Sequence, residues 1–597
     1  MCQRAEGTST AGLRAMPINL LCCKLSVLGD LAKVLQGVLF PLALAIFATG
    51  YCSNDLSTAL VATVLMFVAN IVFGCLCLRE RILFLFLHAG IALFLLTRPI
   101  IGSFDRDRSW FLGSMETTWF AIGSIFLSLL FLFLGSAVYS GVLAFNKERI
   151  RARNCMRKDI PVVCIDDGGR SCNSRSAEAA GFMNECTTKL ATSERVRYIR
   201  AASLCIFLLC FVAALYEGYI KLSYMSGHSY EEYYLIDQTQ HIPWIIGVLK
   251  PIMFYALCSY LACLPRRRPT VICLVLYVVT TLPMLIIGSR SEFVITFLFA
   301  ALYFVLRAVT DTEERWITKR LIVAVCVLAP FGVFAMGVMN YTRADDTIYG
   351  FSFMSLLADA LYKQGVSFTV LGHGYDVNPQ VQDLGFRFFS IGGVITTVTQ
   401  GFIGQTFLGC QDLGSTNSAL LALNGSTYAH TMSFFAHWNY LGGEGYGSSY
   451  LLELFADFGY VGIAVGSFIL GVAFSAMSSM IGRRWFGGMI ALVAAAAIFH
   501  MPRGYFIEWI DFVISTRFLL GVVLIVSLAS VLSVVSRVGA KPAIDCFSSV
   551  HAVSLESMGK RDLTNQVVLR YENECTMSEK STVIANKHGV PVRREML

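Results

Sequence analysis

The amino-acid sequence predicts an all-α fold, a polytopic transmembrane bundle of about 12 helices that carries one large external loop. Three observations lead to this fold class. Only 15% of the 597 residues are charged, whereas a soluble domain averages about 25%. Many apolar runs reach about 20 residues, which is the length of helix that crosses a bilayer. The runs are continuous, whereas the strands of a transmembrane β-barrel alternate between polar and apolar residues.

The apolar runs fix the expected positions of the spans. We expect them at residues 34–51, 60–78, 83–102, 117–145, 201–222, 245–265, 270–288, 293–308, 321–341, 460–481, 487–500 and 512–536. An even number of spans places both termini on the same side of the membrane.

The distribution of basic residues orients the bundle. Short basic turns follow alternate spans, at Arg79 and Arg81, at residues 266–268 and at residues 483–484. Lysine and arginine are enriched in the cytoplasmic loops of membrane proteins, so these turns and both termini are predicted to be cytoplasmic. The net charge of +7 therefore reflects membrane topology and does not indicate binding to nucleic acid.

The segments between the spans complete the expected organisation. We expect a cytoplasmic N-terminal segment (1–33), spans one to four (34–145), a cytoplasmic loop (146–200), spans five to nine (201–341), a large periplasmic loop (342–459), spans ten to twelve (460–536) and a polar, disordered cytoplasmic tail (537–597).

The loop at residues 342–459 is rich in Phe, Gly and Leu and is only moderately polar, unlike a freely solvated loop. Residues 351–363 have helical spacing, with Leu356 and Ala360 on one side. We therefore expect short amphipathic helices that lie at the membrane interface or dip back into the protein. Such a loop would roof a cavity over the bundle.

Several arginines break the positive-inside trend. Arg290, Arg343, Arg503 and Arg517 lie at the ends of spans, and Arg98 and Arg387 lie in the outer segments. A charge at membrane depth is costly unless it is paired or solvated, and guanidinium is well suited to phosphate. The set therefore favours an anion site, although snorkelling or ion pairs such as Arg290 with Glu292 would also explain individual members.

The run from Gly442 to Gly459 combines a glycine-rich loop with an acidic helix. Ser448 or Ser449 can cap the helix, and Glu453 and Asp457 then share one of its faces. Gly462 and Gly466, in the span that follows, form a GxxxG pattern typical of close helix packing. The carboxylates are candidate proton acceptors, and the alternative is a capped helix with solvated acids.

The sequence favours neither a metal nor a cofactor. Asp105 and Asp107 resemble a metal-binding DxD pair, a spacing that is common by chance, and the 19 cysteines form no CxxC pair. Three histidines lie in the large loop, namely His373, His430 and His437. Histidine is suited to general base catalysis near neutral pH, but such a residue is more often an ordinary loop residue.

The stretch from Gly442 to residue 471 resembles the O-antigen polysaccharide polymerase (Wzy) family. The resemblance rests on the Gly-Ser-Ser of residues 447–449, on Glu453 and on the Asp-Phe-Gly-Tyr-Val-Gly of residues 457–462. Gly-Ser-Arg at 288–290 and Pro-Arg-Gly at 502–504, with Arg517 further on, are similar to arginine-bearing pieces of the related enterobacterial common antigen polymerase. The likeness extends over roughly residues 270–530.

This resemblance implies a GT-C-like glycosyltransferase of the bacterial inner membrane with a periplasmic active site. Such an enzyme joins oligosaccharide repeat units carried on undecaprenyl pyrophosphate, which serve as donor and acceptor, and a chain-length regulator is a possible partner. Pyrophosphate would be bound by Arg290, Arg343, Arg503, Arg517, Arg98 and Arg387. The candidate bases are Glu453 first, then His437 and Asp457.

Three other functions remain open at this point. An O-antigen ligase has a similar bundle and a large late loop, and physical arguments from the residues do not separate it from a polymerase. A flippase or transporter for lipid-linked sugars predicts charges near the bilayer middle, whereas the candidate charges here lie mainly at the outer ends. A structural membrane subunit would not need clustered outer arginines.

Overall fold

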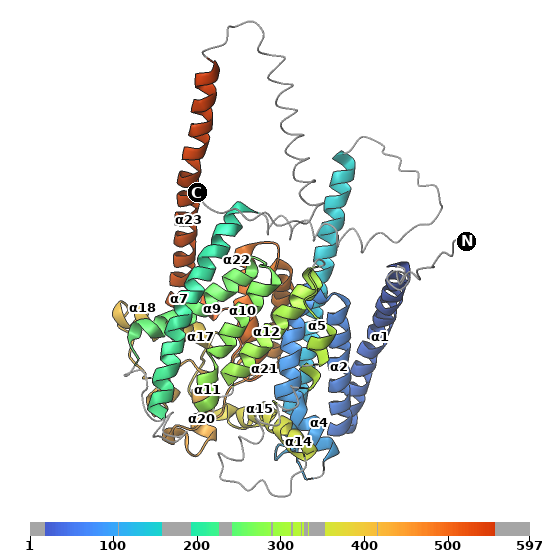
Figure 1. Cartoon of the computed structure of the whole chain (residues 1–597). Helices are drawn as coiled ribbons and strands as arrows, with labels where there is room; N and C mark the ends of the chain where they lie inside the picture. Colours follow the sequence, from blue (N-terminus) through green and yellow to red (C-terminus); the bar gives the residue numbers. More distant parts are fainter. Residues whose placement is uncertain are drawn as a thin grey trace, which may run out of the picture. The chain divides into compact units, whose positions relative to one another are not determined.

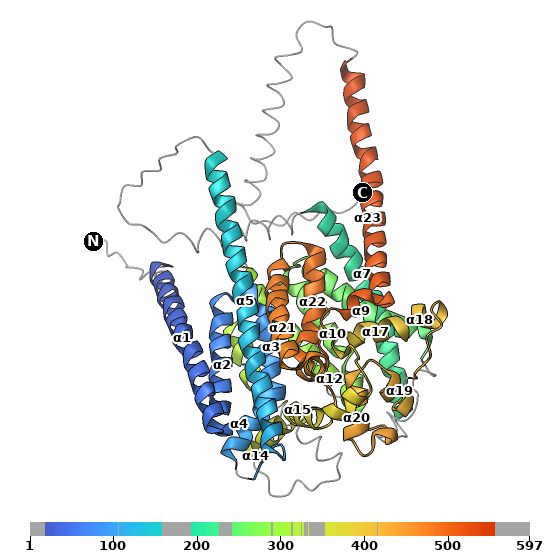
Figure 2. The ribbon, with the colours of Figure 1, turned by 180° about the vertical axis from the view of Figure 1, so that it is seen from behind.

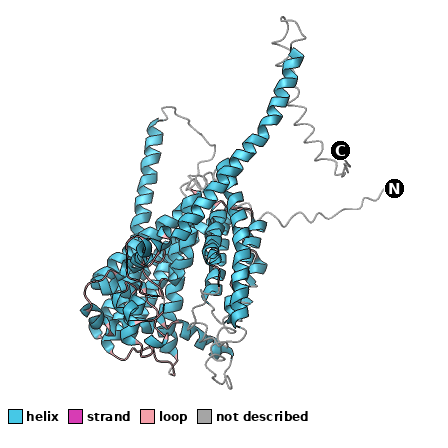
Figure 3. Ribbon diagram, turned by 90° about the vertical axis from the view of Figure 1, so that its left-hand side faces the viewer, coloured by secondary structure: helices cyan, strands magenta, loops and turns pink. Residues whose placement is uncertain are grey.

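The computed structural model is built of helices. It describes residues 18–105, 107–157, 193–225, 242–287, 291–311, 314–323, 325–327, 332, 353–414 and 416–555. Figure 3 shows helices and connecting loops in this part of the chain, and no β-strand is found among these residues. The all-α, polytopic class predicted from the apolar runs is therefore confirmed.

The described residues contain 10 helices that are long and apolar enough to cross a membrane. The first half of the chain supplies α1 (Ile18–Ser53), α2 (Leu56–Leu76), α3 with its continuation (Leu78–Phe104), α5 (Met115–Arg157) and α7 (Glu194–Met225). The second half supplies α9 (Trp244–Ala262), α10 (Arg267–Val279) with α11 (Leu282–Ile287), α12 (Ser291–Thr310), α21 (Tyr450–Met480) and α23 (Thr516–Leu555).

Two of the expected spans are not among these ten helices. The span at 487–500 corresponds to α22 (Trp485–His500), an apolar helix of 16 residues. The span at 321–341 lies mostly outside the described residues. The total of twelve spans therefore stays a prediction.

Contacts divide the chain into two compact units, Met1–Ala529 and Ser530–Leu597. The second unit contains the last turns of α23. All packing described below lies within the first unit, whose helices are labelled in Figure 1.

The centre of the first unit is the contact between α5 and α21. Small residues let the two backbones approach closely, because a Cβ at Gly135 would overlap the carbonyl oxygen of Phe468. Hydroxyl pairs line the same seam, with Ser136 and Ser475 2.7 Å apart. Such a seam of glycine and serine is typical of helix pairs in membranes, where polar groups are satisfied across the interface.

We expect Gly135→Val to destabilise the protein, because the backbone of Phe468 cannot move aside as a flexible side chain would. Overpacking of this kind costs about 1–3 kcal/mol in a well-packed interior. The measurement is the thermal unfolding midpoint of the purified protein in detergent. Gly141→Val on the same helix is the control, because a Cβ there meets no atom within 4 Å. Equal unfolding midpoints for the two variants would contradict the role of this seam.

The loop between residues 353 and 449 forms short helices, as expected. They are α14 (Phe353–Gln364), α15 (Ser367–Asp376), α16 (Asn378–Asp383), α17 (Gly392–Thr399), α18 (Phe402–Thr406), α19 (Ala419–Asn424) and α20 (Tyr428–Ala436), with 3₁₀ turns η3 (Phe389–Ile391) and η4 (Tyr440–Gly442). In α14, Leu356 and Ala360 are buried and Lys363 is exposed, which confirms the amphipathic helix predicted there.

These short helices occupy two levels. In the first, α14 packs on α4 (Thr97–Phe104), and α15 packs on α5 and on the π-helix η1 (Ala92–Leu96) that precedes α4. In the second, α17 and α18 lie beside the long helices, well above α14 and α15 in the views of Figures 1 and 2. The segment from η3 to α18 therefore dips back along the bundle, which is one of the two arrangements expected for the loop.

Helix α21 bends sharply at Gly459. This residue has φ +61°, a conformation that is favourable for glycine and strained for other residues. The bend returns the chain past its own first turns, so that Gly462 and Gly466 pack against Leu454. The GxxxG pattern therefore serves close packing as expected, but its partner is the preceding segment of the same helix. The close contact between α5 and α21 is made by Gly135 and Gly471.

Candidate functional site

The glycine-rich loop before α21 is held at both ends. Asn417 donates hydrogen bonds to the carbonyls of Tyr440 and Glu444, at 3.0 and 2.8 Å. Ser433 on α20 accepts from the Tyr446 N–H and donates to its carbonyl, both at 2.9 Å. The loop therefore has one defined path, and its last residues are delivered to the start of α21.

The start of α21 contains a capped and buried acid. Ser449 is the N-cap and accepts from the N–H of Leu451, which confirms the predicted serine cap. Glu453 is 1% exposed. Its two oxygens accept from the Ser448 hydroxyl at 3.3 Å and from the Phe506 N–H at 2.8 Å. Glu453 thus ties the glycine-rich loop to the segment that follows α22.

That following segment, residues 501–515, forms a compact set of polar side chains together with His500 at the end of α22. His500 Nδ1 lies 3.4 Å from Glu508 Oε1, and the Tyr505 hydroxyl donates to Asp511 at 2.5 Å. The other Glu508 oxygen, Oε2, is buried and has no hydrogen-bond partner. Asp511 begins the 3₁₀ turn η5 (Asp511–Ile514), on which α17 packs. Burial raises the pKa of the Asp511 carboxyl and that of the Tyr505 hydroxyl.

Arg503 lies where the glycine-rich loop meets this segment. A Cβ at Gly447 would come within 3.3 Å of the Arg503 carbonyl oxygen, so glycine permits the close approach. The Arg503 side chain reaches solvent, yet the surrounding protein lowers the pKa of its guanidinium. Arginine nevertheless stays charged at neutral pH. Within the described residues this guanidinium has neither a hydrogen bond nor an ion pair.

Most of the other outer basic residues that the structure describes do have partners. Arg387 donates to the carbonyls of Leu423 and Gly425 and so fixes the turn after α19. The paired lysines and arginines are Arg108 with Asp105 and Asp359, Lys363 with Asp359, Lys221 with Glu217, and Lys250 with Glu217 and Glu292. Arg517 is exposed at the start of α23.

A second polar cluster surrounds Arg98 at the start of α4. The guanidinium lies 4.5 Å from the ring centre of Tyr362, and Nε is buried without a hydrogen-bond partner. His373 stacks on Tyr446 of the glycine-rich loop at 4.5 Å, and His437 meets the same ring edge-on at 4.8 Å. Tyr446 therefore connects this cluster to Gly447 and Arg503.

The π-helix η1 sets the direction in which Arg98 leaves α3. Pro99 lacks the N–H that would continue a regular helix, and the extra residue of the π-turn accommodates this break. The N–H of Thr97 instead bonds to the carbonyl of Ala92, five residues back. Nothing in the apolar pattern of this span distinguishes a π-turn from a continuous helix.

The remaining candidates from the sequence occupy distinct places. Both oxygens of Asp457 accept backbone N–H groups, from Phe389 at 2.9 Å and Ser390 at 2.7 Å, so Asp457 caps η3. His437 Nε2 lies 3.6 Å from Glu444. Arg290 and Arg343 lie outside the described residues.

The structure thus brings Glu453 and Arg503 together and leaves Arg387 and Asp457 in structural contacts. It also adds His500, Tyr505, Glu508 and Asp511, which were not candidates in the sequence. Their spacing has no repeating pattern, and the only signal that could have found them is their density within fifteen residues beside Arg503. Within the described residues no group of three or more His, Cys, Asp and Glu side chains is arranged to hold a metal ion.

Two loop histidines predict a pH dependence of stability. Burial lowers the pKa of His373 and of His430 below the usual 6.5. A lowered folded-state pKa gives stability that is present above pH 6.5 and lost as the pH falls through the folded-state value. We expect the unfolding midpoint of the wild type to fall more between pH 7 and pH 5 than that of the double variant His373→Gln, His430→Gln. Parallel pH profiles would contradict this assignment.

Comparison with known protein families gives a match over most of the chain. A family model described as O-antigen polysaccharide polymerase Wzy matches residues 38–533. The match includes the glycine-rich loop, Glu453, the 501–515 segment and Arg98. No curated protein and no solved structure matches the chain.

Proposed function

The chain belongs to the O-antigen polysaccharide polymerase Wzy family, and from this premise we propose how and where the protein joins saccharide repeat units. As a member of that family it is an O-antigen polymerase, and its apolar helices make it a multi-pass membrane protein. Our proposal is a GT-C-type glycosyltransferase of the bacterial inner membrane. Both termini would be cytoplasmic, and the active site would face the periplasm.

The proposed substrates are oligosaccharide repeat units carried on undecaprenyl pyrophosphate, one acting as donor and one as acceptor. An acceptor hydroxyl oxygen forms a bond to the anomeric carbon of the donor sugar. The bond between that carbon and the pyrophosphate oxygen breaks, and the pyrophosphate leaves with the bonding electrons. The hydroxyl proton passes to a protein base. No metal or other cofactor is part of this proposal.

The observation that carries the proposal is the unpaired guanidinium of Arg503 beside Gly447. A departing pyrophosphate gains negative charge in the transition state, and a fixed cation stabilises that charge without reorganisation. Because Arg503 has no carboxylate partner among the described residues, its charge is available to a substrate. Gly447 permits the glycine-rich loop to approach the Arg503 backbone closely, which holds this residue beside the loop.

Other basic residues would contribute to the same role. Arg517 also lacks an ion pair within the described residues and joins Arg503 in our proposal. Arg98 lies in the separate cluster beside Tyr362 and would contact the substrate away from the pyrophosphate. Arg290 and Arg343 stay in the proposed set from the sequence alone. Arg387 would act indirectly, because its guanidinium is bound to the carbonyls of Leu423 and Gly425.

Several groups are candidates for the base. The carboxylate of Glu453 is enclosed and already accepts two hydrogen bonds, which favours a positioning role. The pair of His500 and Glu508 lies beside Arg503, and the buried Glu508 Oε2 has no donor. A hydroxyl donor from the acceptor sugar would satisfy that oxygen, so we propose this pair as the proton acceptor, with His437 and Asp457 as weaker candidates.

The remaining segments have proposed roles in the same assembly. The segments at 1–33, 146–200 and 537–597 would be cytoplasmic, and the loop at 342–459 would cover the active site from the periplasm. A chain-length regulator that contacts the outer surface is a proposed partner.

The test uses a strain that lacks the gene and compares its surface polysaccharide with that of the complemented strain. A polymerase predicts a single capped repeat unit without the gene and a ladder of long chains with it. Long lipid-linked polymer that is not attached to the surface would instead indicate a ligase. Repeat units trapped in the cytoplasm would indicate a flippase. Either of these last two outcomes would overturn the proposal.

A further inference from the structure

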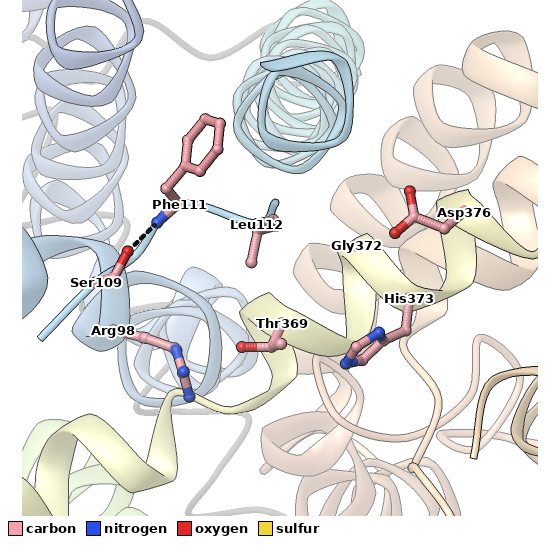
Figure 4. A pocket seen from close by; sticks show the side chains of 8 residues that line it. All are labelled: Arg98, Ser109, Phe111, Leu112, Thr369, Gly372, His373 and Asp376. Atoms are coloured by element: carbon pink, nitrogen blue, oxygen red, sulfur yellow. Dashed lines mark hydrogen bonds between the residues drawn. The ribbon is translucent and has the colours of Figure 1, made fainter. Parts of the chain in front are cut away.

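A cavity of about 180 Å³ lies between α4, the following loop and α15. It is lined by the polar side chains of Arg98, Ser109, Thr369, His373 and Asp376, together with Phe111, Leu112 and Gly372. At ~30 Å³ for each water molecule in the liquid, it has room for about six waters, a volume that suits one sugar ring. Figure 4 shows these side chains around the cavity.

Two of the lining residues each have a polar atom whose hydrogen-bonding capacity the protein leaves unused. Arg98 Nε and Thr369 Oγ1 are both buried, and neither has a hydrogen-bond partner. Figure 4 shows the Thr369 hydroxyl turned toward Arg98. A buried polar group without a hydrogen bond is unfavourable, so two of them at one cavity indicate a polar ligand that satisfies both.

The lining also indicates the chemical class of the ligand. Arg98 supplies one positive charge and Asp376 one negative charge, so the cavity has little net attraction for an anion. The two groups together offer both donors and acceptors. Thr369, His373 and Asp376 lie on one face of α15, at spacings of four and three residues, and form a row that can contact successive hydroxyls. A neutral polyhydroxylated ring requires this mixture.

We propose that this cavity is a saccharide subsite, which binds one neutral sugar of the repeat unit at a distance from the reacting bond. The proposal rests on the proposed function, since it assigns a substrate contact of the same enzyme. Tyr446 links the subsite to the reaction centre, because it stacks on His373 and is followed directly by Gly447, the neighbour of Arg503. A sugar held here would position the lipid-linked unit relative to that guanidinium.

The experiment uses the full chain in nanodiscs. The probe is the free oligosaccharide released from the host's lipid-linked repeat unit by mild acid, which carries neither lipid nor pyrophosphate. Binding is measured by saturation-transfer NMR. Thr369→Val removes the unused hydroxyl at nearly constant shape, and Arg98→Lys keeps the charge over Tyr362 but removes Nε. We expect each variant to weaken oligosaccharide binding about three- to tenfold, the usual effect of one lost hydrogen bond.

A matched control is Ser367→Ala. The Ser367 hydroxyl is also buried without a partner on α15, but it does not line the cavity. We expect this variant to bind the oligosaccharide as the wild type does. Thermal unfolding of each variant checks the fold, and Thr369→Val should be as stable as the wild type or more stable, because it removes an unsatisfied buried group.

The outcomes separate this inference from the proposed function. Arg503→Ala should keep the saturation transfer, because the probe has no pyrophosphate. Unchanged binding in both Thr369→Val and Arg98→Lys, or no binding by the wild type, would overturn the subsite. Binding that is sensitive to Thr369→Val, in a protein that fails to polymerise lipid-linked units, would leave the subsite standing and overturn the proposed function.

Discussion

Replacement of Arg503 by alanine is expected to abolish chain growth while leaving the protein folded. Removal of one fixed donor from a developing oxyanion costs about 10²–10³-fold in rate. The guanidinium makes no hydrogen bond or ion pair within the described residues, so its loss should not destabilise the fold. The surface polysaccharide should change from a ladder to single capped repeat units. The amount of the protein in the membrane, measured by immunoblot, should equal that of the wild type.

Two further variants sharpen the test of Arg503. Arg503→Lys keeps the charge but loses the forked geometry that suits phosphate oxygens, so we expect shortened chains and partial activity. Lys363→Ala removes a cation that is bound to Asp359, at the surface of α14, and should leave the ladder unchanged. A normal chain-length distribution in Arg503→Ala would remove Arg503 from the pyrophosphate site.

Replacement of Glu453 is expected to show whether this residue stabilises the fold or accepts a proton in the reaction. Glu453→Ala leaves the Phe506 N–H and the Ser448 hydroxyl without their acceptor in a buried place. Each unsatisfied group costs about 1–3 kcal/mol, so the unfolding midpoint and the activity should fall together. Glu453→Gln keeps an oxygen for the Phe506 N–H and a polar partner for Ser448. We expect it to retain the wild-type unfolding midpoint and most of the polymerisation rate.

The glutamine variant distinguishes the two roles of Glu453. A general base contributes about 10²–10⁴-fold, and glutamine cannot accept a proton at neutral pH. A well-folded Glu453→Gln protein with a rate reduced more than a hundredfold would therefore make Glu453 the proton acceptor. In that case His500 and Glu508 would be left with a supporting role. The comparable variant Glu508→Gln should lose activity without a fall in the unfolding midpoint if our assignment is correct.

Local sequence was sufficient for features that depend on near neighbours. The apolar runs predicted the long helices because a helix in a bilayer satisfies its own backbone and needs only length and hydrophobicity. The serine cap of α21 was predictable because the cap and the N–H that it accepts are two residues apart. The Wzy resemblance, which the family match over residues 38–533 confirms, likewise rests on short contiguous pieces.

The arginines show what the sequence could not predict. Sequence could gather Arg98, Arg387 and Arg503 as outer cations, but it could not say which of them has a partner. Arg387 is bound to carbonyls 36 and 38 residues away, and Arg503 has no such contact. Whether a charge is paired depends on the positions of distant groups, and pairing decides whether it is available to a substrate.

The sequence by itself therefore determined the membrane class, the helical pattern and the family. Only the tertiary structure decided that Glu453 joins the glycine-rich loop to the segment after α22, that Gly459 turns α21 back on Leu454, and that Arg98 and Thr369 meet at one cavity. The physical reason is the separation along the chain of the residues that interact. Hydrophobicity and capping act between near neighbours in the chain, whereas a site is made by hydrogen bonds, burial and unpaired charge among residues that folding brings together.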